Sequence, residues 1–259
     1  MTDAGEIRDY LFSLAPRALK MDFDNVGLLV GGPDTPVTRA LFALDITGEV
    51  IDEAAALGAQ LIVSHHPVVW DAMKDVTGET VQSAKVLKLI RNGIAAICMH
   101  TNLDIADGGV NDLLMAALGG KVTGILEPTG EGAGCGRVGE IPAQMPLRDF
   151  LAVCKAALHG NGLRYYDAHR GVKKLAVMGG AGGDCVALAS SLGCDTYVTA
   201  DIKYDQFLTA RELGLNLIDA DHFATENVVV PQLMAWINKK FPEIETSIST
   251  VHDQTAKFF

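Results

Sequence analysis

The chain has 259 residues, about half of them hydrophobic and 27 of them glycine, enough for one large α/β unit or two halves of roughly 130 residues each. Its net charge of −11, from 21 basic and 32 acidic side chains, repels phosphate backbones, so we expect no direct nucleic-acid binding. The five cysteines form no CxxC pair, which favours free, buried thiols. The first residues lack the features of a signal peptide, and no apolar run reaches the ~18 residues of a membrane span, so we expect a cytoplasmic protein without a membrane segment.

Short apolar runs alternate with segments of helical periodicity, each bounded by glycine or polar residues. In the first half we expect, in chain order, helix Gly5–Leu14, strand Ala40–Asp45, helix Gly48–Leu57, strand Leu61–Ser64, helix Val81–Asn92, strand Ile94–Met99 and helix Val110–Leu118. In the second half we expect strand Leu175–Met178, helix Cys185–Leu192, strand Thr196–Thr199, helix Asp205–Leu213, strand Asn216–Ile218 and a last helix over Gln232–Lys240. This rhythm predicts mostly parallel sheets with helices on both faces.

The segment between the two series, residues 121–139, is rich in glycine and is interpreted as a connector. We therefore expect a first α/β half over residues 1–125 and a second over residues 126–259, in one compact unit without an inserted domain. The two halves also resemble each other: Leu57–Ser64 aligns with Leu192–Thr199, each with a helix end, a glycine and a strand closing on a hydroxyl. An internal duplication is the interpretation we favour, although any α/β chain repeats βα units.

Polar side chains follow three of the expected strands, where ligands bind in open parallel sheets. His65 and His66 follow the strand Leu61–Ser64, and two segments with His, three residues and a carboxylate follow later strands. These later pairs are His100 with Asp104 and His222 with Glu226. Imidazole and carboxylate together suit zinc, iron or manganese, so the pattern predicts a metal site.

Adjacent histidines on a regular strand point to opposite faces of the sheet. His65 and His66 can share one site only if the chain has left the strand, which Pro67 favours; alternatively, each serves a different metal ion. Pro231 suits the first turn of the last helix, which places Glu226 in or just before that turn.

Each residue also has a structural interpretation. Asp104 could order the following turn, and Glu226 could cap a helix. The isolated histidines His159, His169 and His252 are interpreted as solvated or capping residues outside the site. The glycine-rich turn over residues 179–183 could present backbone amides to a phosphate, but it lacks a P-loop Lys and is better interpreted as a tight turn.

The motifs together resemble the Nif-three-like family of dinuclear-metal hexameric proteins, known as GTP cyclohydrolase I type 2-like. Five segments carry the resemblance in family order: residues 24–28 (DNVGL), 64–67 (SHHP), 100–112 (HTNLDIADGGVND), 201–203 (DIK) and 217–226 (LIDADHFATE). The chain departs from the family pattern at Phe23, where Trp is usual, at Asp221, where Gly is usual, and at Phe223, where Tyr or His is common.

The resemblance implies two similar α/β halves with a metal site between them and a homo-hexamer. It also implies two divalent metal ions per chain (Zn, Fe or Mn), with the metal ligands His65, His66, Asp104, His222 and Glu226. His100 is then expected as a catalytic residue rather than a metal ligand, and Asn102, Asp201 and Lys203 as substrate-binding residues. Phe23 is interpreted as a packing change, and Asp221 as a carboxylate that could alter metal preference.

The sequence thus predicts a dinuclear metal-dependent hydrolase acting on a small nucleotide-like or phosphorylated substrate, nominally GTP cyclohydrolase-like. Metal ions would act as Lewis acids and bring the pKa of a water molecule to roughly 7. The alternative is a metal-binding regulatory or scaffold protein that acts through partner recruitment.

Overall fold

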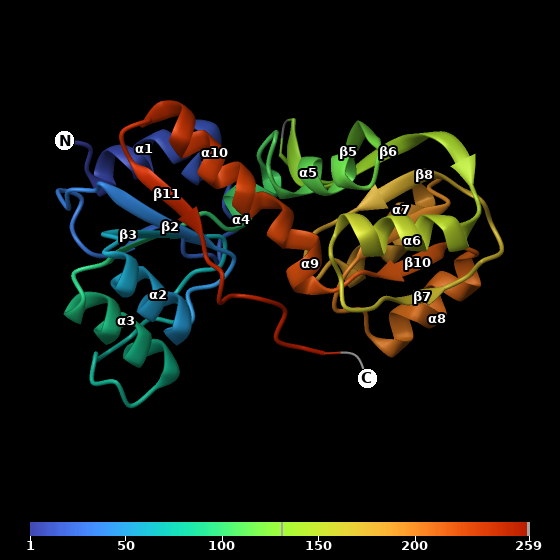
Figure 1. Cartoon of the computed structure of the whole chain (residues 1–259). Coiled ribbons are helices and arrows are strands. Elements are labelled where there is room, and N and C mark those ends of the chain that lie inside the picture. Colours follow the sequence, from blue (N-terminus) through green and yellow to red (C-terminus); the bar gives the residue numbers. More distant parts are fainter. Residues whose placement is uncertain (131, 258–259) are drawn as a thin grey trace. The chain divides into compact units, whose positions relative to one another are not determined.

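In the computed structural model, which describes residues 1–130 and 132–257, helices and strands alternate along the chain (Figure 1). The helices are α1 (Ala4–Leu14), α2 (Gly48–Leu57), α3 (Val81–Arg91), α4 (Thr101–Ile105), α5 (Val110–Ala117), α6 (Leu147–Ala157), α7 (Val186–Ser191), α8 (Tyr204–Leu213), α9 (His222–Glu226) and α10 (Val230–Lys240), with short 3-10 turns η1 (Arg17–Leu19), η2 (Gly183–Cys185) and η3 (Asn227–Val229). The strands are β1 (Gly27–Val30), β2 (Arg39–Ala43), β3 (Leu61–Ser64), β4 (Ala95–Cys98), β5 (Lys121–Gly130), β6 (Ala133–Met145), β7 (Arg164–Tyr166), β8 (Val172–Val177), β9 (Thr196–Thr199), β10 (Asn216–Asp219) and β11 (Glu245–Ile248).

The first of two compact units comprises residues 1–106 and 229–253. Its sheet has the order β1-β4-β3-β2-β11, and all pairs are parallel except β1 with β4. Helices α1 and α10 lie on one face and α2 and α3 on the other (Figure 1). Every residue of β3 and β4 is buried, as expected for strands covered on both faces.

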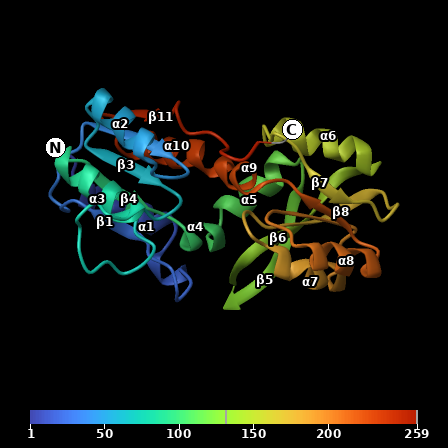
Figure 2. The ribbon, with the colours of Figure 1, turned by 90° about the horizontal axis from the view of Figure 1, so that it is seen from below.

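The second unit comprises residues 107–228 and 254–259. Its sheet has the order β5-β6-β8-β9-β10-β7, with a parallel centre of β8, β9 and β10 and antiparallel pairing toward both edges. Helices α5 and α6 lie on one face and α7 and α8 on the other (Figure 2). The predicted α/β class with two similar halves is therefore confirmed.

The two halves share one topology. The order α1-β1-β2-α2-β3-α3-β4-α4-α5 is repeated as α6-β7-β8-α7-β9-α8-β10-α9-α10. The sheet neighbours repeat as well, because β1-β4-β3-β2 in unit 1 matches β7-β10-β9-β8 in unit 2. This agreement supports an internal duplication more strongly than the sequence alignment does.

The last elements of each repeat pack in the other unit. Helix α5 ends the first repeat and packs against β8 in unit 2, whereas α10 ends the second and packs against β2 in unit 1. The units are consequently bounded at residues 106/107, 228/229 and 253/254, which differs from the expected division at residue 125/126. Each sequence repeat therefore ends in the other unit: α5, β5 and β6 belong to unit 2, and α10 and β11 belong to unit 1.

The prediction of a connector over residues 121–139 is wrong. This segment contains β5 and the first half of β6, which form an antiparallel hairpin on the sheet of unit 2. Three of the six glycines there, Gly134, Gly136 and Gly139, are required by the close approach of neighbouring atoms. A Cβ atom at Gly134 would lie 2.3 Å from the backbone oxygen of Glu127, and one at Gly139 would lie 2.5 Å from that of Lys121. Small residues therefore hide the alternation that normally reveals a strand.

A buried ion pair joins α5 to this hairpin. Arg137 on β6, only 2% exposed, donates from Nε to Asp112 Oδ1 (2.8 Å) and from Nη2 to Asp112 Oδ2 (3.2 Å). Its Nη1 donates to the carbonyls of Gly134 and Gly136. At least four of the five N–H groups of the guanidinium thus donate to oxygen, as a buried charge requires.

We predict that Asp112→Asn lowers the free energy of unfolding by about 2–3 kcal/mol, because the buried Arg137 charge loses its counter-charge. Chemical denaturation followed by circular dichroism measures the change. Asp107→Asn is the matched control: Asp107 lies 3.8 Å from the same guanidinium but is fully exposed, so no measurable loss is expected. Equal effects of the two substitutions would contradict the buried pair.

Candidate metal centre

The histidine pair of unit 1 lies where β3 ends. The backbone amides of His65 and His66 both donate to the carbonyl of Leu44, at 3.2 and 2.9 Å, so the alternating ladder of the strand has stopped. The hydroxyl of Ser64 donates to the carbonyl of His66 (2.8 Å) and fixes this turn. The condition under which neighbouring histidines can face one site is therefore met.

His100, which precedes α4 at the end of β4, joins the pair. The ring centroids of His65, His66 and His100 lie 5.0–5.4 Å apart, and one nitrogen of each ring lies within 4.8 Å of the others. Asp104 on α4 approaches the same cluster, with its Oδ1 3.5 Å from Nε2 of His65. Unit 1 thus brings together four of the predicted site residues.

The Nδ1 atom of each of these histidines faces an oxygen. That of His65 lies 2.8 Å from the carbonyl of Met99, that of His66 lies 2.8 Å from Oδ1 of Asp45, and that of His100 lies 2.9 Å from Oδ1 of Asp24. Because a carbonyl or carboxylate oxygen only accepts, the proton resides on Nδ1 and the Nε2 lone pair is left as the coordinating atom.

Two supporting carboxylates are held in the ionised state. Burial alone would raise the pKa of Asp24, but hydrogen bonds from His100 and Thr101 hold it well below its usual range. The pKa of Asp45 is likewise lowered, since hydrogen bonds from His252 and His66 outweigh its burial. An ionised carboxylate that accepts from one ring nitrogen of an imidazole makes the other nitrogen a stronger ligand for a metal ion.

In unit 2, His222 and Glu226 are at opposite ends of α9, one helical turn apart. Nδ1 of His222 lies 2.8 Å from Oδ2 of Asp201, and Nε2 lies 3.0 Å from Oε2 of Glu226. Burial would lower the pKa of His222, but its two carboxylate partners outweigh burial and raise the pKa to about 9. The two carboxylates therefore favour the positively charged form of the His222 imidazole.

The turn after β8 provides room for Glu226. Gly180 has a positive φ of 65°, and a Cβ atom there would lie 2.2 Å from Oε1 of Glu226. Its amide donates to the hydroxyl of Thr225 (3.0 Å), beside Glu226 in the helix. The glycines of this turn serve close packing, in agreement with its interpretation as a tight turn.

The other predicted site residues lie at different depths. Asn102 is fully buried and donates from Nδ2 to the carbonyl of Ala15 (2.7 Å), while its Oδ1 accepts no hydrogen bond from the described residues. Asp201 has a positive φ of 54° and supports His222, and Lys203 is exposed at the start of α8. These positions are compatible with different roles, so substrate binding by the three remains a prediction.

Sequence reasoning missed four residues around the cluster: Asp24, Asp45, Trp70 and His252. Trp70 is 51% exposed, with its ring centroid 5.2 Å from that of His100 and 6.1 Å from that of His66. The side chain of His252 is only 9% exposed and contacts Asp45, so of the two alternatives, solvated or capping, the solvated one does not hold. Phe23, interpreted as a packing position, is 73% exposed.

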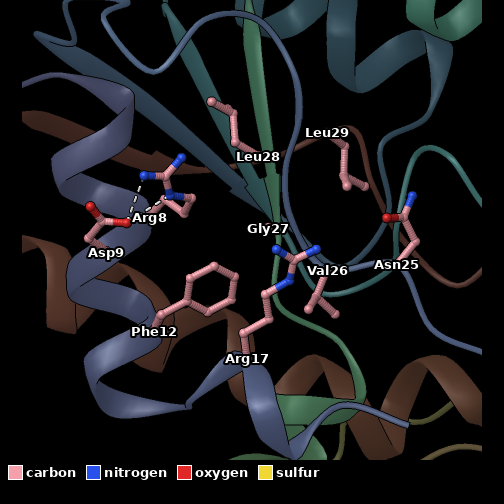
Figure 3. Close-up of a pocket in the computed structure, with 9 residues that line it drawn as sticks. All are labelled: Arg8, Asp9, Phe12, Arg17, Asn25, Val26, Gly27, Leu28 and Leu29. Atoms are coloured by element: carbon pink, nitrogen blue, oxygen red, sulfur yellow. Dashed lines mark hydrogen bonds and ion pairs between the residues drawn. The ribbon is translucent and has the colours of Figure 1, made fainter. Parts of the chain in front are cut away.

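A separate cavity of about 360 Å³ lies between α1, η1 and β1 (Figure 3). Arg8, Phe12, Arg17 and the segment from Asn25 to Leu29 contribute to its lining, and none of the histidines does. Arg8 is paired with Asp9 there. Asn25 of the cavity lining directly follows Asp24, which bonds to His100.

The fold and these two groups of side chains define a class of protein: an α/β chain with a repeated topology that presents histidines and carboxylates beyond its strand ends. Residues 2–255 match the family described as Duf34/NIF3 (NGG1p interacting factor 3), and the chain belongs to this family.

Individual relatives agree. A protein of Clostridium perfringens named "GTP cyclohydrolase 1 type 2 homolog" is 35% identical over 255 residues, covering 97% of this chain and 96% of that protein. The crystal structure of a Bacillus cereus protein related to NIF3 has a TM-score of 0.91 at 26% identity and covers 100% and 99% of the two chains. A hypothetical protein of Staphylococcus aureus has a TM-score of 0.90 at 28% identity and covers 99% of both chains.

The longest helices in the described part of the chain have 11 residues, well short of the ~20 that a helix needs to span a membrane. All five cysteines are buried, and none forms a disulfide among the described residues.

The backbone explains why glycine is usual at position 221 of the family pattern. Asp221 has a φ of 76°, which costs a non-glycine residue about 1–3 kcal/mol, yet its side chain caps α9 by accepting from the amide of Ala224 (3.3 Å). We predict that Asp221→Gly is more stable than Asp221→Ala by about 1–2 kcal/mol, because only glycine relieves the strain while both lose the cap. Thermal unfolding ranks the two variants, and the reverse order would contradict strain at this position.

Proposed function

We propose that the protein is a cytoplasmic, dinuclear metal-dependent hydrolase that acts on a small nucleotide-like or phosphorylated substrate. Its metal ligands are His65, His66 and Asp104 from unit 1 with His222 and Glu226 from unit 2. The working form is a homo-hexamer, a proposal that rests on family resemblance.

One observation carries the metal site: His65, His66, His100 and His222 all direct Nδ1 at a carbonyl or carboxylate oxygen, at 2.8–2.9 Å. Histidines that ligate metal ions almost always donate their second ring N–H in this way. The donor set of neutral imidazoles with two carboxylates suits zinc, iron and manganese. The raised pKa of His222 supports the same conclusion, because an environment that retains a proton also attracts a divalent cation.

The divalent ions would supply Lewis acidity and lower the pKa of a water molecule toward neutrality. His100, held by the buried Asp24, is positioned to accept or return a proton at Nε2. Asp201 holds the imidazole of His222 in its orientation. The protein thus provides fixed donors and one proton acceptor, which is sufficient for hydrolysis by activated water.

The substrate class is proposed from the side chains at the surface of each unit. Trp70 exposes half of its indole beside His66 and His100, and a planar heterocycle can stack on such a ring. The exposed side chain of Lys203 offers a positive charge for an anionic group. A base and a phosphate are the two parts of a nucleotide that these groups would bind.

The family description favours a second candidate, because it includes the words "interacting factor". In this alternative the protein binds metal but acts as a scaffold or regulator that recruits partners. A scaffold retains its function when a metal ligand is replaced, provided that the variant still folds and assembles, whereas a hydrolase loses turnover.

Purified protein is expected to bind about two equivalents of zinc or manganese per chain and to hydrolyse at least one nucleotide or phosphoester. Elemental analysis after gel filtration gives the stoichiometry, and a screen of nucleoside triphosphates and sugar phosphates gives the activity. His169→Ala, at an exposed histidine outside the cluster, is the control and should leave both unchanged. One metal ion or none per chain in excess metal would count against the dinuclear site.

Glu226→Gln should reduce metal content more than His100→Ala does. Glutamine preserves the shape of the side chain but removes its charge and one oxygen able to bind a metal ion, whereas the loss of His100 should cost about 10–100-fold in activity and leave the ligands intact. Metal analysis and circular dichroism of both variants separate loss of metal from loss of fold. Depleted metal in His100→Ala beside full occupancy in Glu226→Gln would make His100 a ligand and remove Glu226 from the set.

A further inference from the structure

The C-terminal segment of the chain returns to the histidine cluster. Strand β11 pairs in parallel with β2, with Ile248 opposite Phe42. Because the two strands are parallel, the backbone continues in the same direction after each of them. The residues after β11 therefore run alongside those after β2. His252 consequently meets Asp45, which precedes it by 207 residues in the sequence.

Asp45 is clamped between two imidazoles. Its Oδ1 lies 2.8 Å from Nδ1 of His66, and its Oδ2 lies 3.0 Å from Nε2 of His252. The same His252 nitrogen is 3.2 Å from the backbone amide of Asp45. Because an ionised carboxylate can only accept, the 3.0 Å contact with Oδ2 requires a proton on Nε2, and we assign its hydrogen bond to the carboxylate. The side chains of His66 and His252 are 12% and 9% exposed, which leaves the carboxylate little freedom to rotate.

The segment is anchored before it reaches Asp45. The amide of Ser249 donates to the carbonyl of Phe42 (2.8 Å), and the amide and hydroxyl of Thr250 donate to Oε1 of Glu53 on α2, at 2.9 and 2.7 Å. These bonds exceed what is needed to end an edge strand. They fix the position of the chain two residues before His252.

Two residues after His252, Gln254 contacts an aspartate of unit 2, as His252 contacts Asp45 in unit 1. Its Nε2 donates to Oδ1 of Asp221, the residue that caps α9. Helix α9 bears His222 and Glu226, so the same short segment contacts the support of a proposed metal ligand in each unit.

We propose that residues 249–254 form a positioning segment for the metal centre, with His252 as its principal positioning residue. His252 orients the carboxylate of Asp45, Asp45 orients the imidazole of His66, and Gln254 steadies the start of α9 through Asp221. The segment touches neither metal nor substrate. This inference rests on the proposed metal site, and it assigns to the end of the chain a role in metal affinity.

The test compares substitutions at His252 that separate packing from hydrogen bonding. His252→Phe retains a buried ring but removes the donor, and His252→Gln retains a donor on a side chain of similar reach. Zinc or manganese is titrated into metal-free protein by calorimetry, and thermal unfolding of the metal-free variants reports folding. His169→Ala is the matched control.

Metal-free His252→Phe is expected to fold like the wild type and to bind metal about 10–100-fold more weakly, as for other groups that orient metal ligands. His252→Gln should restore most of the affinity, and Gln254→Leu should weaken it less than tenfold, since Asp221 retains its bond to Ala224. Wild-type affinity in His252→Phe overturns the proposal. The proposal is also overturned if His252→Phe binds metal more weakly but unfolds at a lower temperature as well, and His252→Gln does not restore the affinity.

The titration also distinguishes failure of the proposed metal centre from failure of the positioning role. If the wild type itself binds no metal in the titration, the metal centre is absent and the positioning role falls with it. If the wild type binds metal but the His252 variants match it, only the positioning role is lost.

Discussion

Parallel pairing of β2, β3 and β4 is the constraint on which the histidine cluster depends. The register sets Ala43 opposite Ser64 and Ser64 opposite Cys98, so the three strands end level with one another. The residues that follow them, from Asp45 to His66 and His100, then emerge at one edge of the sheet, where backbone amides and carbonyls are no longer used by the ladder. A shift of one residue in this register would turn the supporting carboxylates away from the imidazoles. The positions of the side chains in the site are therefore set by the burial of apolar strands that have no part in the chemistry.

The offset between sequence repeat and packed unit has a similar consequence. Because α10 and β11 come from the second repeat but pack in unit 1, the end of the chain is held against β2, whose loop contains Asp45. The offset thus explains how His252, far away in sequence, comes to contact the support of His66.

The sequence was sufficient to predict the parallel centres of both sheets, and the bounds of β3 and β9 agree with expectation, since their apolar runs end at a glycine and a hydroxyl residue. The hairpin of β5 and β6 could not be predicted, because glycines such as Gly134 fill positions where a side chain would meet the facing backbone. The edge strands β7 and β11 are partly exposed and contain polar residues, so they lack the apolar run that marks a buried strand. The predicted histidines and carboxylates lie in conspicuous motifs, whereas the role of His252 depends on the register of two strands from opposite ends of the chain.

Equal topology does not give the halves equal chemistry. His100 and His222 follow equivalent strands, yet His100 bonds to the fully buried Asp24, which also accepts from Thr101, whereas His222 bonds to the half-exposed Asp201 and to Glu226 in its own helix. In unit 1, three carboxylates are distributed over three imidazoles, because Asp24 bonds to His100, Asp45 bonds to His66 and Asp104 lies 3.5 Å from His65. In unit 2, two carboxylates flank the one imidazole of His222 and raise its pKa to about 9. The repeated topology therefore places imidazoles and carboxylates after equivalent strands, but only in unit 2 do two carboxylates act on a single ring and favour its positive charge.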